Sequence, residues 1–249
     1  MMTSIENQNE KFNEVYSALD NLSKSWKIDP IIRDIHLGRR HDLQDFTIKI
    51  NQVTFHIPYL SEISKYMIWD CLWPECHNCC NRQGRLPLTT SDISEISENL
   101  GYIHRSEFLR NETYVATWEN YSADEEAGIP LITTLSMINL KRKPTETETE
   151  NGKPLPCRFL DDAGACTLHP SKPGVCYLYP FYSWSENYKN RISIHASFQL
   201  TGDCPGYLLT DSVDDMMHGL EKYSKIIYDY TMKMNSTIRQ GFARVDFSN

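Results

Sequence analysis

The chain has 249 residues, of which 40% are hydrophobic and 23% charged, a composition typical of a globular protein rather than a disordered one. Its formal net charge is -8, so we expect no non-specific binding to nucleic-acid phosphates. No run of 18 apolar residues predicts a membrane span, and the first residues do not resemble a secretory signal. We therefore expect a cytoplasmic protein.

The first part of the chain predicts helical and strand segments in turn. Residues 4–26 place apolar side chains three, four and seven positions apart, which indicates an amphipathic helix that ends at residues 29–30, Asp-Pro. Alternation over residues 46–57 predicts a β-hairpin whose turn lies at residues 51–52, Asn-Gln. Residues 60–70 are expected to form a short helix that leads into the first cysteines.

The next segment carries a helix-start signal. Thr89 and Asp92 fit a capping box, and Gly101 is the expected stop of the helix that follows. Two β-rich runs, residues 113–118 and 131–140, predict strands.

The second half of the chain combines a polar loop with short elements. Residues 141–156 are polar and of low complexity, which predicts an exposed loop. The turn residues 162–164 predict a hairpin in which Cys157 and Cys166 face each other. A short helix is expected to open at residues 172–173, Lys-Pro.

The last elements complete the predicted fold. Cys176 should lie near the start of the short helix, where the helix dipole lowers a thiol pKa. Residues 191–198 predict a strand, residues 204–206 a turn, and residues 210–239 a long amphipathic helix.

Eight cysteines dominate the functional interpretation, and four of them fall within ten residues. In a reducing compartment thiols more often bind metal than form structural bridges, and neighbouring Cys79 and Cys80 cannot easily pair with each other. A metal centre is therefore favoured over a disulfide framework or unrelated thiols. The candidate ligands are Cys71, Cys76, Cys79, Cys80, Cys157, Cys166, Cys176 and Cys204.

The identity of the metal is left open by the residues alone. Structural zinc takes four ligands, and a [4Fe–4S] cluster takes four cysteines, so eight thiols suit two sites or one site with spare thiols. His77 and His169 are weaker candidates, because so many cysteines compete with them. No catalytic triad, P-loop or glycine-rich cofactor loop is visible in the sequence.

Several of these cysteine blocks resemble those of the YkgJ-type cysteine-cluster proteins, the zinc- or iron-chelating CxxCxxCC family. The resemblance covers residues 65–207, and the blocks that carry it are Cys76–Cys80, Leu88–Ile93, Cys157–Leu160, Cys166 to Phe181 with Lys172-Pro173 and Cys176, and Cys204–Gly206. Four residues separate Cys71 from Cys76 where the signature has two, and Lys172 replaces the usual arginine.

The resemblance implies metal binding through the cysteines, and it favours an iron–sulfur cluster, [4Fe–4S], narrowly over zinc. One branch of the family is similar to flagellin lysine N-methylases, which raises a protein-modifying enzyme as an alternative, beside an Fe–S oxidoreductase. Whether the chain is an enzyme is left open, as is a protein partner or substrate. Neither nucleic acid nor a membrane is expected as a partner.

We thus expect an α+β fold with a small cysteine-rich strand and loop core, framed by N- and C-terminal helices. The expected segments are an N-terminal helix and hairpin over residues 1–60, a metal-binding domain over residues 65–207 that includes the polar loop 141–156, and a C-terminal helix over residues 208–249.

Overall fold

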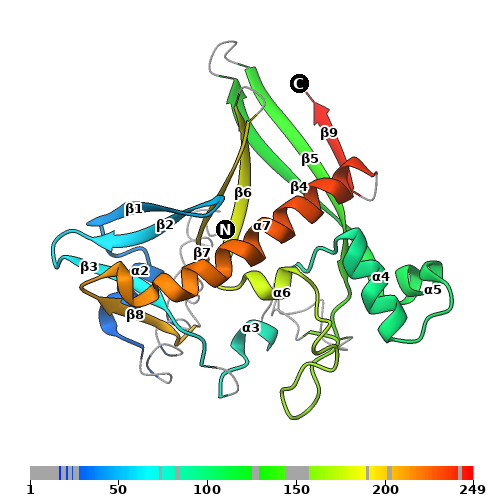
Figure 1. The fold of residues 1–249 in the computed structure, drawn as a ribbon, viewed down its shortest axis with the longest axis horizontal. Coiled ribbons are helices and arrows are strands. Elements are labelled where there is room, and N and C mark those ends of the chain that lie inside the picture. Colours follow the sequence, from blue (N-terminus) through cyan, green and yellow to red (C-terminus); the bar gives the residue numbers. More distant parts are fainter. Residues whose placement is uncertain are drawn as a thin grey trace, which may run out of the picture. The chain divides into compact units, whose positions relative to one another are not determined.

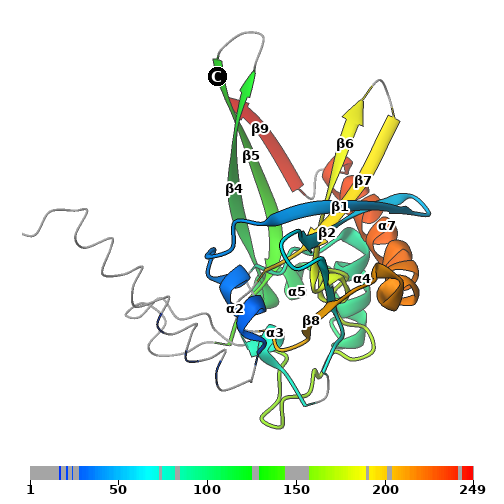
Figure 2. The same ribbon diagram turned by 90° about the vertical axis from the view of Figure 1, so that its left-hand side faces the viewer.

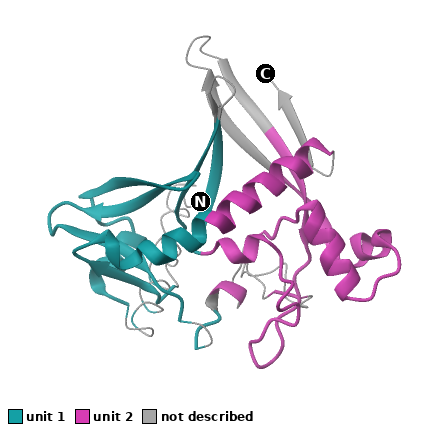
Figure 3. Cartoon of the chain, viewed as in Figure 1, with its two compact units in different colours: residues 1–78, 180–224 teal, residues 79–179, 225–249 magenta. Residues whose placement is uncertain are grey.

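The computed structural model describes residues 28–72, 75–81, 85–124, 129–143, 157–188, 191–200, 204–240 and 243–248, together with residues 17, 21 and 24. The chain forms two compact units (Figure 3): unit 1 combines residues 1–78 with 180–224, and unit 2 combines residues 79–179 with 225–249. Helices and strands both contribute, so the predicted α+β class is confirmed. The helix predicted over residues 4–26 lies almost wholly outside the described residues.

Unit 1 is built on a six-stranded sheet, whose strands are labelled in Figure 1 and of which Figure 2 gives a second view. Strands β2 and β7 pair in parallel, and the other neighbours pair antiparallel. This parallel pairing joins strands more than 130 positions apart, which no local sequence signal predicts. The path through the sheet is β6 (Phe181–Tyr188), β7 (Arg191–Phe198), β2 (Val53–Leu60), β3 (Lys65–Trp69) and β8 (Tyr207–Thr210), with β1 (Leu43–Ile50) paired along β2.

The predicted hairpin over residues 46–57 is confirmed by strands β1 and β2. Its turn lies where the sequence predicts it, and Asn51 has the positive φ of 54° that asparagine tolerates in a tight turn. Val53, Phe55 and Ile57 are fully buried, because alternate side chains of a strand point to the same face.

The short helix predicted over residues 60–70 is wrong, because Lys65–Trp69 form strand β3 between β2 and β8. Only the central residue Met67 is fully buried, and the ladder hydrogen bonds of both neighbours decide the conformation of this short segment. A helix was missed just before the hairpin: α2 (Pro30–His36) begins at Asp29, whose carboxylate accepts a hydrogen bond from the N–H of Ile31 at 2.7 Å.

Unit 2 contains a three-stranded antiparallel sheet and several helices. The strand order is β4 (Thr113–Asp124), β5 (Ile129–Leu140) and β9 (Ala243–Ser248), so both predicted strands of this region are confirmed and the third was missed. The remaining elements are α3 (Asn78–Asn81), α4 (Thr90–Asn99), α5 (Arg105–Glu112), the one-turn helix α6 (Val175–Leu178) and the last part of α7 (Met217–Arg239).

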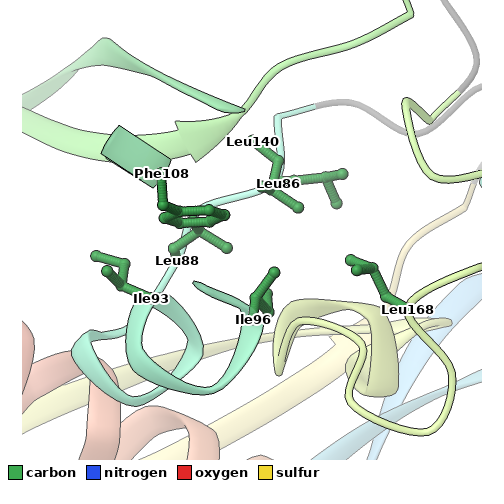
Figure 4. Packing of buried hydrophobic residues seen from close by; sticks show 7 residues of the cluster. All are labelled: Leu86, Leu88, Ile93, Ile96, Phe108, Leu140 and Leu168. Carbon is green, nitrogen blue, oxygen red and sulfur yellow. The ribbon is translucent and has the colours of Figure 1, made fainter. Parts of the chain in front are cut away.

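The core of unit 2 is an apolar cluster drawn in Figure 4: Leu86, Leu88, Ile93, Ile96, Phe108, Leu140 and Leu168. Helix α4 contributes to it because its capping box fixes where the helix begins. Thr89 accepts from the N–H of Asp92, Asp92 accepts from the N–H of Thr89, and Gly101 follows with a positive φ of 74°, so the predicted signals are confirmed. Three cysteines, Cys157, Cys166 and Cys176, pack against this cluster.

The long helix predicted over residues 210–239 is confirmed: a turn of 3-10 helix, η1 (Val213–Met216), leads directly into α7. Among the helices that the structure describes, none is long and apolar enough to cross a membrane. The three sequence segments proposed above stay a prediction, since the two units group the chain by compactness rather than by those boundaries.

Candidate metal centre

The eight predicted ligands are divided between the two units. Unit 1 contains Cys71, Cys76 and Cys204, and unit 2 contains the other five. All eight lie in the described part of the chain, and none of them forms a disulfide. Each unit therefore offers its own set of thiols.

The thiol of Cys80, on helix α3, lies where its ionised form is stabilised. A hydrogen bond from Cys79 lowers the pKa of Cys80 to about 7, with burial opposing and the positive charges of Lys172 and Arg142 assisting. The thiolate is the form that binds metal, so Cys80 is available as a ligand near neutral pH.

Cys157 is tied to Cys80 through the backbone. Its N–H donates to the carbonyl of Cys80 at 2.9 Å, and its own main chain pairs with that of Arg142. Burial raises the pKa of the Cys157 thiol, and negative charge at Cys166 and Cys80 raises it further. These thiols are thus close enough for their charges to interact, and a bound cation would favour their ionised forms.

Arg142 is the positive charge that these thiols share. Burial lowers the pKa of its guanidinium, and the charges of Cys157, Cys176 and Cys80 act in the opposite direction. The sequence does not reveal this role, because Arg142 is the second residue of the polar run 141–156, which predicts an exposed loop. Residues 144–156 of that run lie outside the described residues.

The predicted opposition of Cys157 and Cys166 across a hairpin is wrong. Cys166 pairs with Leu160, and the N–H of Thr167 donates to the carbonyl of Phe159 at 2.8 Å. The turn itself is confirmed, with Gly164 at a positive φ of 83°. Because Asp161 accepts from the N–H groups of residues 163 and 165, the turn is tight and places Leu160, rather than Cys157, opposite Cys166.

The position of Cys176 is set by Asp92, a residue from the start of α4. The Oδ1 atom of Asp92 accepts from the N–H of Gly174 at 2.9 Å, two residues before Cys176, while its Oδ2 atom serves the capping box. Tyr230 packs against Gly174 so closely that an added Cβ would lie 2.9 Å from its ring, and burial raises the pKa of this phenol. Helix α6 has only four residues, so the predicted effect of its dipole on Cys176 has little support.

Within unit 1, Cys204 is the buried thiol, and the indole N–H of Trp69 donates to its sulfur at 3.3 Å. The turn that follows lies against strand β3: the N–H of Asp70 donates to the carbonyl of Gly206 at 2.9 Å. A Cβ at Gly206 would lie 2.2 Å from the carbonyl oxygen of Asp70, so this close approach requires glycine.

The other predicted ligands of unit 1 precede α3. Cys71 is exposed, and the N–H of Cys76 donates to the carbonyl of Leu72 at 3.0 Å. The Nδ1 atom of His77 is buried, and no described residue offers it a hydrogen bond. His169, the second histidine considered, is exposed, and its N–H donates to the carbonyl of Cys166 at 3.1 Å.

The donor chemistry of unit 2 fits a soft metal ion: several thiols, one with a pKa of about 7, interact beside two cationic side chains and above an apolar core. The positions of these side chains do not yet form a complete metal site. Among the described residues, no group of three or more His, Cys, Asp or Glu side chains is already arranged to hold a metal ion. Binding would therefore have to draw these thiols closer together, as happens where metal binding and folding are coupled.

A family model matches residues 70–198, more than half of the chain and a stretch that contains seven of the eight cysteines. Cys204 lies beyond its end. No curated protein and no solved structure matches the chain. The match agrees with the resemblance seen in the cysteine blocks and supports metal binding. The chain belongs to the CxxCxxCC family, described as a "putative zinc- or iron-chelating domain".

Proposed function

We propose that this protein is a thiolate metal-binding module whose metal is held in unit 2 by cysteines from three separate segments. Cys79 and Cys80 come from α3, Cys157 and Cys166 from the hairpin, and Cys176 from α6. The metal would be iron in an iron–sulfur cluster or zinc, both of which accept four thiolate ligands.

The observation that carries this proposal is the environment of Cys80. Its thiol has a pKa of about 7, its carbonyl is bonded to the Cys157 backbone, and its charge interacts with Lys172 and Arg142. A centre with four thiolates and either metal is doubly negative, so two nearby cations would stabilise it. A merely structural thiol in an apolar core has no need of such neighbours.

The remaining predicted ligands are Cys71, Cys76 and Cys204 of unit 1, and we keep them as candidates for a second site. The buried Nδ1 of His77, beside Cys76 in the sequence, is a further candidate there. A reducing compartment such as the cytoplasm would keep all of these thiols available. The methylase-like and oxidoreductase alternatives stay predictions, since no observation on the described residues favours either of them.

Metal analysis of the full chain, purified without oxygen, tests the proposal. We expect a stoichiometric metal that gel filtration does not remove. Iron with an equal amount of acid-labile sulfide and a brown colour would identify a cluster, and colourless protein with zinc would identify a zinc site.

The outcome that contradicts the proposal is protein without bound metal whose eight cysteines all react with an alkylating reagent under native conditions. Four intact disulfides in protein taken directly from cells would contradict it equally, because paired sulfurs are not available as thiolate ligands.

A further inference from the structure

Two histidines of unit 1 meet across the parallel pair of strands β2 and β7. His56 lies on β2 and His195 on β7, where the pairing sets Thr54 opposite His195. The Nε2 atom of His56 and the Nδ1 atom of His195 are 3.1 Å apart. The side chains are 21% and 17% exposed, so the pair is partly buried and still open to solvent.

Each imidazole has its other ring nitrogen directed to an acidic side chain. The Nδ1 atom of His56 lies 3.5 Å from the carboxylate of Asp45, on β1. The Nε2 atom of His195 lies 3.6 Å from Glu186, on β6, and 3.2 Å from the hydroxyl of Ser193. Two carboxylates therefore lie on the outer sides of the histidine pair.

These contacts favour one arrangement of protons on the rings. The carboxylates at 3.5 and 3.6 Å attract a proton to each outer nitrogen, and in that tautomer each inner nitrogen of a neutral ring carries its lone pair. Two lone pairs that face each other across 3.1 Å repel unless a cation lies between them. That cation is either a shared proton or a metal ion, and in the other tautomer one inner N–H donates to the facing nitrogen across the same 3.1 Å.

Trp184 holds this arrangement from one side. Its ring stacks on His195, with centroids 5.4 Å apart and an interplanar angle of 19°, and its Nε1–H donates to Glu186 at 3.1 Å. The same indole therefore limits the rotation of the His195 ring and orients the carboxylate beside it. Metal-binding histidines characteristically have their second nitrogen oriented in this way by a carboxylate or another acceptor.

We propose that His56 and His195 bind a divalent transition-metal ion between Nε2 and Nδ1, at a site separate from the cysteines. Metal–nitrogen bonds of about 2.0–2.1 Å at a tetrahedral angle place two ligand nitrogens about 3.3 Å apart, close to the spacing observed here. With two protein ligands, the other positions belong to water or an exogenous group, which agrees with the lack of any three-residue ligand group among the described residues. Imidazole ligands suit Zn²⁺, Cu²⁺ and Ni²⁺.

Zinc titration of the full chain, followed by calorimetry and by NMR of the imidazole ¹⁵N nuclei, tests this site. We expect one zinc ion that shifts the signals of Nε2 of His56 and Nδ1 of His195. His56→Gln and His195→Gln should abolish that step, while His104→Gln, at the exposed N-cap position before α5, should leave it unchanged. Asp45→Asn and Glu186→Gln retain both ligands and should weaken binding about 10- to 100-fold.

The site is refuted if zinc leaves the NMR signals of those two nitrogens unchanged, because a hydrogen bond alone then joins the pair. It is also refuted if His56→Gln or both carboxylate variants bind zinc as tightly as wild type. The carboxylates are 71% and 60% exposed, so their variants test the site even where a histidine variant fails to fold. Cys80→Ser should not change this zinc step. A failure of the histidine site can therefore be distinguished from a failure of the cysteine centre.

Discussion

Replacing Asp92 with alanine should reduce both the stability of unit 2 and its metal content. The carboxylate accepts from the backbone and hydroxyl of Thr89 at 2.8 and 2.7 Å and from the backbone of Gly174 at 2.9 Å. It therefore joins the start of α4 to the segment that carries Cys176. Without it, the N–H of Gly174 loses its acceptor and Cys176 loses its fixed approach to the other thiols.

The magnitude follows from two losses. Loss of the helix cap costs about 1 kcal/mol, and loss of a hydrogen bond to a charged group costs about 1.5–3 kcal/mol, so we expect roughly 2.5–4 kcal/mol in all. For a chain of this size each kcal/mol lowers the melting temperature by about 2–4 °C. The assay is thermal unfolding by circular dichroism, with metal content measured on the same samples.

Thr89→Ala is the matched control, because it removes the cap hydroxyl and leaves the bond between Asp92 and Gly174 in place. It should cost about 1 kcal/mol and leave the metal bound. If Asp92→Ala has the same melting temperature as Thr89→Ala and retains its metal, the proposed link between α4 and Cys176 is wrong.

Two further predictions concern Cys80 and Gly206. In metal-free protein, Cys80 should reach half its maximal rate of alkylation near pH 7. Lys172→Met should move that midpoint to higher pH, because a positive charge near the thiolate is lost. A midpoint at the ordinary thiol pKa of 9.0 in the wild type would contradict the lowered pKa of Cys80. Since the pKa of Cys80 is lowered on folding, its thiolate stabilises the metal-free fold above pH 9, and this contribution is lost as the pH falls through about 7, as pH-dependent unfolding would show. Gly206→Ala should destabilise unit 1, because its Cβ would lie 2.2 Å from the carbonyl oxygen of Asp70. Gly219→Ala, within α7, should instead stabilise the helix by about 1 kcal/mol, because its Cβ would lie 3.8 Å from the side chain of Met216, an ordinary contact distance; equal melting temperatures for the two variants would refute the close approach at Gly206.

The sequence predicts correctly those parts of the fold that depend on interactions between residues close together in the chain. The capping box of Thr89 and Asp92, the turn at Asn51 and the apolar stripe of the last helix each depend on residues a few positions apart. Strand β3 was predicted as a helix because its five residues are too short to show a period, and its conformation depends on two neighbouring strands.

The candidate site likewise combines features that neighbouring residues reveal with features that depend on contacts between distant segments. The sequence shows that the cysteines are suitable metal ligands. It can group them only by their spacing along the chain. Arg142 as their shared cation, and Asp92 as the acceptor for Gly174, arise from contacts between distant segments, so no local pattern contains them. The contact of His56 with His195 depends likewise on a parallel strand register, which brings together two side chains 139 positions apart in the sequence.

The most direct test of the central claim is the metal content of four single variants, Cys80→Ser, Cys157→Ser, Cys166→Ser and Cys176→Ser, purified without oxygen. The control is Asp162→Asn, an exposed position in the hairpin that carries Cys157 and Cys166. We predict that each cysteine variant loses most of its metal and melts at a lower temperature, because metal binding contributes to the folding free energy, while the control retains both. Full metal content and unchanged melting in Cys80→Ser and Cys176→Ser would contradict a metal centre built from the thiols of unit 2.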